Sequence, residues 1–112
     1  MELVEQRQNG VAIVEPCGRV DSTTSEVLER ALERLVQGGE RRVIVDLAGV
    51  EYMSSAGLRV LLVAAKRLGK TSLLLCSLTE PVRQVFDLAG FLPLFGIEPS
   101  RESALQRFAG IA

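Results

Sequence analysis

The sequence contains no histidine, and this absence excludes several kinds of chemistry. Ser-His-Asp and Cys-His hydrolases and most zinc sites depend on imidazole, so these sites are not expected. Aromatic residues are also scarce, with four phenylalanines and one tyrosine, which leaves little surface for stacking nucleic-acid bases. Thirteen basic and fourteen acidic residues give a formal net charge of -1. Without a basic field, we expect no direct binding to nucleic acid.

Long apolar runs are missing as well. No run approaches the roughly 20 residues that span a bilayer, and the N-terminus lacks the basic and apolar regions of a signal peptide. We therefore expect a cytoplasmic protein without membrane insertion. Cys17 and Cys76 each lie in an apolar segment typical of a strand, which indicates small buried side chains rather than a disulfide or metal framework. The length of 112 residues suits one domain over 1–112.

The order of apolar segments and turn residues predicts an α/β fold. Asn9-Gly10 separates two strand-like segments and indicates a β-hairpin, and Thr23 and Glu26 have the spacing of a helix capping box. We expect strands near 3–8, 11–17, 43–45, 73–76 and 94–97, and helices beginning near Thr23, Ser55, Thr79 and Ser100. The prediction is an N-terminal hairpin followed by alternating helices and strands, in a mixed sheet of about four or five strands with about four helices.

One segment formally fits a relaxed nucleotide-binding P-loop pattern, the stretch 64–71. A working P-loop follows a strand and opens a helix, whereas this segment is expected to end a helix and lead into a strand. We interpret Gly69 as a helix terminator and Lys70 as a favourable charge near the helix C-terminus.

The most informative stretch, 46–59, leads from a strand into a helix. It resembles the STAS domains of anti-sigma factor antagonists, which have an Asp after a strand, a hydrophobic pair, then a serine, a small residue, Gly and Leu. These positions are filled by Asp46, Tyr52-Met53, Ser55, Ala56, Gly57 and Leu58. The segment Gly18-Arg19-Val20-Asp21 is similar to an earlier motif of the family, so the resemblance covers nearly the whole chain.

The resemblance implies a single STAS domain that works by binding rather than as an enzyme, with no catalytic residues, metal or cofactor. It implies that Ser55 is phosphorylated by the partner, an anti-sigma factor with serine kinase activity. The unmodified form would bind this partner and release the sigma factor, and a serine phosphatase would reset the switch. Asp21 would lie near the serine within the contact surface.

Physical chemistry offers two interpretations of the serine pair. A phosphate on Ser55 at a helix N-terminus would be tolerated locally, yet its charge beside Asp21, Asp46 and Glu51 would oppose docking of a partner. Alternatively, Ser54 and Ser55 serve only as N-capping residues. Many relatives carry an acidic residue just before the target serine, whereas this chain has Ser54 at that position. Because Ser54 offers a second hydroxyl, it is the second choice for phosphorylation.

The helix after the serines carries two kinds of apolar residue. Leu58, Leu61, Leu62, Ala65 and Leu68 form a core stripe, whereas Val60, Val63 and Ala64 lie away from it, among basic residues. This second group either forms a docking surface or is covered by a neighbouring helix. The predicted partner-binding residues are Asp21, Ser54, Ser55, Gly57, Arg59 and Val63.

Two other functions remain open at this stage. The chain could be a STAS subunit of another assembly, such as a lipid-transport complex or a stress-sensing particle. A small nucleotide-binding or hydrolytic enzyme is the third hypothesis, and it rests on the P-loop-like segment and the acidic residues.

Overall fold

An antiparallel hairpin opens the fold. Strands β1 (Glu2–Gln8) and β2 (Val11–Val20) meet at Asn9-Gly10, where both residues have positive φ, 55° and 76°. This confirms the turn predicted from the Asn-Gly pair. The coordinates come from a computed structural model and describe residues 1–110.

The remaining helices and strands alternate as the sequence predicts, except that two strands, β3 and β4, precede α2. They are α1 (Ser25–Gln37), β3 (Val43–Asp46), β4 (Val50–Met53), α2 (Ser55–Leu68), β5 (Leu73–Cys76), α3 (Glu80–Leu88), a 3-10 turn at Leu92–Leu94, β6 (Gly96–Glu98) and α4 (Arg101–Phe108). None of the helices within 1–110 combines the length and apolar character required to cross a membrane.

One mixed sheet holds these strands together, in the order β1-β2-β3-β5-β6. All neighbours except β1 and β2 run parallel. The α/β class is confirmed, and the described residues contain a sixth strand beyond the four or five expected. This strand, β4, pairs with the end of β2 after a register shift between Gly18 and Arg19.

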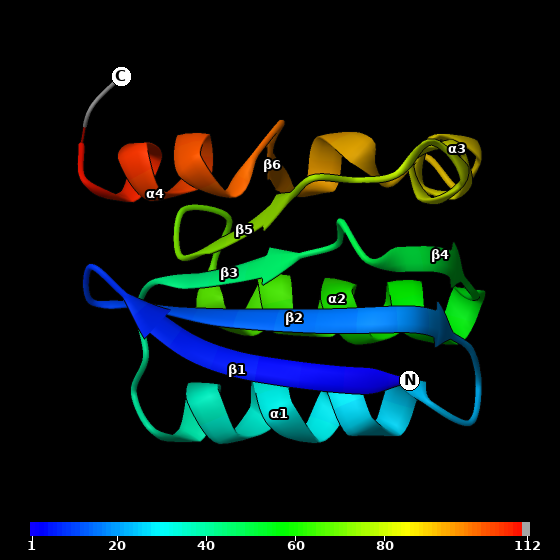
Figure 1. Ribbon diagram of the computed structural model, residues 1–112, viewed down its shortest axis with the longest axis horizontal. Coiled ribbons are helices and arrows are strands. Elements are labelled where there is room, and N and C mark those ends of the chain that lie inside the picture. Colours follow the sequence, from blue (N-terminus) through cyan, green and yellow to red (C-terminus); the bar gives the residue numbers. More distant parts are fainter. Residues whose placement is uncertain (111–112) are drawn as a thin grey trace.

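Helices cover both faces of the sheet, with α1 and α2 on one side and α4 on the other (Figure 1). Alternation along β2 explains the two layers: Ala12 and Val14 pack in the cluster that contains residues of α1 and α2, and Val11 and Ile13 pack with Ala104 of α4. Helix α3 packs beside β4, where Thr79 Oγ1 donates a hydrogen bond of 2.8 Å to the Val50 carbonyl.

Two predicted helix ends have different outcomes. Ser100 caps α4 as expected, because its Oγ accepts the Ser103 N–H at 3.0 Å. The Thr23–Glu26 capping box is wrong. Thr24 precedes α1 without a capping bond of its own, and the N–H groups of Thr23 and Thr24 donate to Asp21 Oδ1 instead.

The P-loop-like segment lies where the sequence placed it, at the end of α2 and before β5. Gly69 follows α2 with φ 97°, and its N–H donates to the Ala65 carbonyl. The Lys70 ammonium donates to the Pro93 carbonyl at 2.9 Å. A helix ends at this segment rather than beginning there, so its geometry does not match a phosphate-binding loop.

Candidate functional site

The candidate site lies where β2 and β4 end and α2 begins. The Ser54 N–H donates a hydrogen bond of 2.8 Å to the Val20 carbonyl at the end of β2. This bond joins two segments far apart in sequence, so that Asp21, the residue after Val20, follows directly on the contact with Ser54. The end of β2 and the beginning of α2 lie at the same edge of the sheet (Figure 1). The two motifs found in the sequence therefore meet in space.

The two adjacent serines have different roles in the fold. Ser54 has extended φ and ψ of −84° and 171°, and its Oγ accepts the Gly57 N–H at 3.3 Å, so it is the N-cap of α2. Ser55 is the first helical residue and is exposed. Its hydroxyl forms no hydrogen bond with another residue of 1–110. Capping therefore accounts for Ser54 but leaves Ser55 free.

Gly57 lies buried under the first turn of α2. A Cβ added at this position would come within 2.8 Å of Val20 Cγ1 and would also collide with the Met53 sulfur. The glycine therefore lets the helix approach the ends of β2 and β4 closely. A partner cannot touch a residue in this place, so Gly57 shapes the site from below and does not contribute to its surface.

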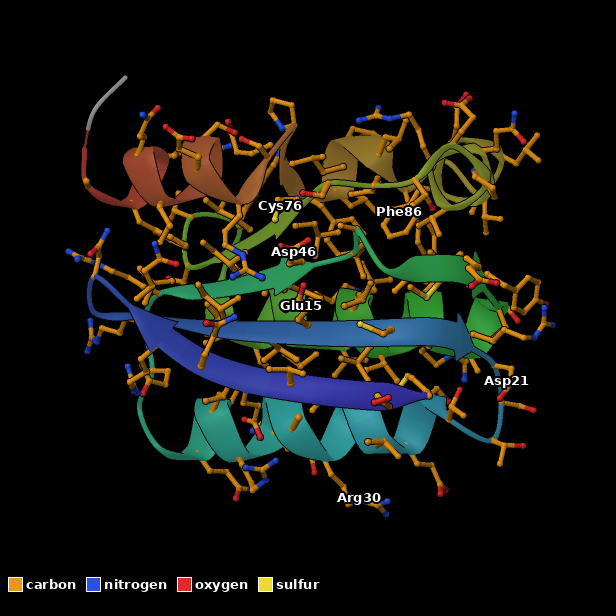
Figure 2. The ribbon with its side chains drawn as sticks, viewed as in Figure 1. Glu15, Asp21, Arg30, Asp46, Cys76 and Phe86 are labelled. Carbon is orange, nitrogen blue, oxygen red and sulfur yellow. The ribbon has the colours of Figure 1, made fainter. Side chains whose placement is uncertain are left out.

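Asp21 stabilises the turn between β2 and α1. Its Oδ1 accepts the N–H groups of Thr23 and Thr24, each at 3.0 Å, and the Thr24 hydroxyl at 3.1 Å. The backbone hydrogen bond from Thr24, followed by that from Thr23, lowers the pKa of Asp21 below its ordinary value. Asp21 is therefore a fixed negative charge at this end of the molecule, where Figure 2 shows it at the tip of β2.

The expectation that Asp46 adds charge beside Ser55 is wrong. Asp46 shares a face of β3 with Ile44, which packs against Ala104 of α4, on the side of the sheet opposite α2. Asp46 as a whole is 4% exposed, and its carboxylate accepts hydrogen bonds from Arg101 Nε at 2.9 Å and the Ala48 N–H at 3.0 Å. Figure 2 shows Asp46 and Glu15 near the middle of the sheet, away from Asp21. Strand alternation made this orientation predictable.

The apolar residues on the outer side of α2 divide into two groups. Val60 and Ala64 are buried, and together with Leu32 and Val36 of α1 they line a narrow cleft between the two helices. For these two residues, the interpretation that a neighbouring helix covers them is correct. Val63 remains 48% exposed.

Ser55, Arg59 and Val63 follow one another at four-residue intervals and so share one face of α2. A hollow lies on each side of this row. The first is formed by Ser25, Glu29, Ser55, Ala56, Arg59 and Val60, and the second by Ser55, Leu58, Arg59, Leu62, Ala89 and Phe91. We call the row, the two hollows, Ser54 and Asp21 the Ser55 surface.

Two exposed side chains near this surface, Arg19 and Tyr52, are not among the partner-binding residues predicted from the sequence. The Arg19 guanidinium lies 4.2 Å from the centre of the Tyr52 ring, and the two residues pair across β2 and β4. Tyr52 is 39% exposed. The attraction between the guanidinium and the ring holds the two exposed side chains together across the strands. The sequence signal for both was their place in the two motifs, Arg19 in the segment 18–21 and Tyr52 in the segment 46–59.

The site offers no evident place for a metal. Among residues 1–110, no three His, Cys, Asp or Glu side chains are grouped to hold an ion. The buried Cys76 thiol faces the α4 side, and burial raises its pKa to about 11, which keeps it protonated and inert. The geometry instead presents a free hydroxyl, a guanidinium and two hollows to a macromolecular partner.

Comparisons with known proteins identify the family. The STAS domain model matches residues 2–104. The protein BtrV of Bordetella bronchiseptica, provisionally designated an anti-sigma factor antagonist, is 44% identical over 96% of this chain and 95% of its own length. Among solved structures, an anti-sigma factor antagonist from Mycobacterium paratuberculosis has a TM-score of 0.89 at 26% identity, covering 96% of this chain and 93% of that one.

A third comparison concerns a modified protein of the same fold. The Bacillus cell fate determinant SpoIIAA, in its phosphorylated form, has a TM-score of 0.71 at 18% identity. The match covers 95% of this chain and 98% of that one. At this identity the likeness concerns the fold.

Proposed function

This chain belongs to the STAS domain family, and from that premise we propose that it is a cytoplasmic anti-sigma factor antagonist controlled by phosphorylation of Ser55. The unmodified chain binds an anti-sigma factor that is also a serine kinase, and this binding releases the sigma factor. The similarity to BtrV along almost the whole chain supports the antagonist role.

The proposed regulation by phosphorylation is supported by the structural difference between Ser54 and Ser55. Ser54 Oγ is engaged as the N-cap of α2, whereas the Ser55 hydroxyl is exposed and has no hydrogen-bond partner within residues 1–110. A kinase needs a hydroxyl that can enter its active site, and only Ser55 offers one here without disrupting a helix cap. Ser54 remains the second candidate for modification.

In the proposed modification, Ser55 Oγ attacks the γ-phosphorus of ATP. The new Oγ–P bond forms as the bond from the γ-phosphorus to the bridging oxygen breaks; ADP leaves, and the hydroxyl proton passes to a base of the kinase. A serine phosphatase reverses the state by hydrolysis, in which water releases inorganic phosphate and restores the hydroxyl.

The modification acts on binding through charge. A phosphate adds roughly −1.5 to −2 charges at neutral pH. Asp21 and the exposed Glu51 already place negative charge at this end of the molecule, and Asp46 makes no contribution because it is paired with Arg101 on the other face. A partner that covers the Ser55 surface must then desolvate a phosphate next to carboxylates. This cost weakens the complex.

The unmodified surface supplies complementary contacts. Arg59 and Val63 form the exposed row beyond Ser55, and Asp21 lies beside its beginning. Gly57 holds this arrangement close to the sheet from below. We therefore assign partner contact to Asp21, Ser54, Ser55, Arg59 and Val63, and a positioning role to Gly57.

The test combines affinity capture with phosphosite mapping. The chain is incubated with the captured anti-sigma kinase and ATP, in parallel with the Ser55→Ala and Ser54→Ala variants. We expect Ser54→Ala to be modified and Ser55→Ala to remain unmodified. Ser55→Asp should weaken the complex severalfold or more, whereas unchanged affinity would contradict the electrostatic switch.

Affinity capture also tests the alternative within the same family. Recovery of transporter subunits or stress-particle components, without an anti-sigma kinase, would favour a STAS subunit of another assembly. Phosphorylation of Ser54 alone would place the switch at the capping residue, contrary to the assignment made from hydrogen bonding.

A further inference from the structure

We propose that Arg59 is the residue that binds the phosphate on Ser55, so that phosphorylation both adds charge and removes a cation from the partner-binding face. This inference rests on the proposed modification of Ser55. Within residues 1–110, Arg59 takes part in no ion pair and no helix cap, and the proposal assigns a role to its side chain.

Arg59 is placed to reach the modified hydroxyl. It follows Ser55 by one helical turn within α2, and side chains at this spacing lie on the same face about 5–6 Å apart at Cβ. Both residues also line both of the hollows that flank the row. The helix register and the shared hollows place the two side chains on the same face, one turn apart, within reach of a phosphate carried by Ser55 Oγ.

The guanidinium has no competing ion pair within the described residues 1–110. The salt bridges found there engage Arg7, Arg34, Arg67, Arg101 and Arg107. Glu29 of α1 lines the first hollow with Arg59, but no bond joins them, and both side chains are exposed. A phosphate dianion has a higher charge than Glu29 and three acceptor oxygens, so it would be the preferred partner for a planar donor group.

Pairing changes what the surface offers to an anti-sigma factor. In the unmodified chain, Arg59 projects free donors between the two hollows, where a carboxylate of the partner can bind them. In the phosphorylated chain, the same donors are held by the phosphate one turn away. The partner then meets a negative group and loses a positive one at the same place.

The test measures the phosphate itself and requires neither kinase nor partner. The full chain is produced with phosphoserine incorporated at position 55 during translation, and the second ionisation of the phosphate is followed by phosphorus NMR as the pH is varied at 0.1 M salt. This ionisation has an ordinary pKa of about 6, and a neighbouring guanidinium lowers it by favouring the dianion.

We expect Arg59→Gln to raise this phosphate pKa by roughly 0.2–0.5, from the size of exposed helical ion pairs at 1.36 kcal/mol per pKa unit. Arg59→Lys should give an intermediate value, because it keeps the charge but loses the two-pronged geometry. Glu29, Asp21 and Glu51, on the elements around Ser55, all raise the phosphate pKa, and the helix N-terminus lowers it. These effects are common to every variant.

Arg67→Gln is the matched control. It removes the same charge from the same helix at a position twelve residues after Ser55, which is about 18 Å along the axis and beyond the Debye length of about 10 Å at 0.1 M salt. We expect no change in its phosphate pKa. Equal pKa values for the parent and Arg59→Gln would overturn the proposal, as would equal shifts in both glutamine variants. Failure of the kinase to modify Ser55 would refute the proposed function in a separate experiment.

Discussion

Ser54 caps α2 and Ser55 does not, and this difference predicts how much each serine contributes to stability. Ser54→Ala removes the oxygen that accepts the Gly57 N–H. Loss of an N-cap costs about 0.5–2 kcal/mol, and the bond length of 3.3 Å exceeds the usual value near 3.0 Å, so we expect the lower half of this range, about 0.5–1 kcal/mol. For a chain of 112 residues this corresponds to a fall in Tm of about 2–4 °C.

Urea unfolding provides the assay, with Ser55→Ala as the control. Ser55 is exposed and its hydroxyl has no protein acceptor or donor within 1–110, so this change should stay within about 0.5 kcal/mol of the parent. The dependence of unfolding free energy on urea should be unchanged in both variants, because neither alters the surface exposed on unfolding. Ser54→Asp should retain the cap, since a carboxylate oxygen accepts the same N–H and favours the helix N-terminus.

The order of the two alanine variants decides the outcome. If Ser55→Ala destabilises the chain as much as Ser54→Ala, then the hydroxyl of Ser55 has a structural role, and it is no longer the free group on which the proposed regulation depends. If both variants match the parent, then Ser54 is not an effective cap and the distinction between the serines disappears.

Four further changes test other parts of the structure. Gly57→Ala should destabilise the chain by about 1–3 kcal/mol in urea unfolding, since its Cβ meets Val20 and Met53; a gain would contradict the close approach, because alanine is otherwise the better helix former. Arg101→Met should cost about 2–4 kcal/mol by leaving Asp46 buried without its ion pair, and adding Asp46→Asn should recover part of this loss. Asp21→Asn should lower the unfolding free energy near pH 7. The pKa of Asp21 is lower in the folded chain than in the unfolded chain, so its stabilising contribution is present above the unfolded-state pKa and is lost as the pH falls through the folded-state pKa. The unfolding free energies of the parent and the variant should therefore converge in acid. Tyr52 adjoins the Ser55 surface, and we extend the predicted partner contact to its exposed ring: Tyr52→Ala should weaken partner binding severalfold in calorimetry while leaving Tm almost unchanged, and full affinity would limit the interface to the Ser55 surface.

Sequence reasoning was most successful where the signal is local. The Asn9-Gly10 turn and the Ser100 cap depend on a few adjacent residues, and both are present in the structure. The helix beginning at Ser55 was also placed correctly, because a serine before an apolar stripe with a glycine at its end marks both boundaries.

The predictions that fail are those decided by a competing hydrogen-bond acceptor or by the pairing and alternation of strands. Strand β4 has four residues, two of them exposed, and it exists because the end of β2 shifts register to pair with it. The predicted capping box of Thr23 and Glu26 does not form, because the N–H groups of Thr23 and Thr24 donate to the carboxylate of Asp21 instead. Asp46 is near Ser55 along the chain, which predicts that the two lie close together in space. Because side chains alternate along β3, however, the Asp46 side chain lies on the other face of the sheet.

The hydrogen bond from the Ser54 N–H to the Val20 carbonyl restricts how the structure can respond to phosphorylation. It holds the beginning of α2 at the edge of the sheet, and Gly57 lets the same helical turn pack closely against Val20. A helix anchored in this way cannot tilt or unwind easily to accommodate a new group on its outer side. The phosphorylated and unmodified forms would then share one backbone shape, and a partner would distinguish them by the charges and hydrogen-bond donors that the surface presents.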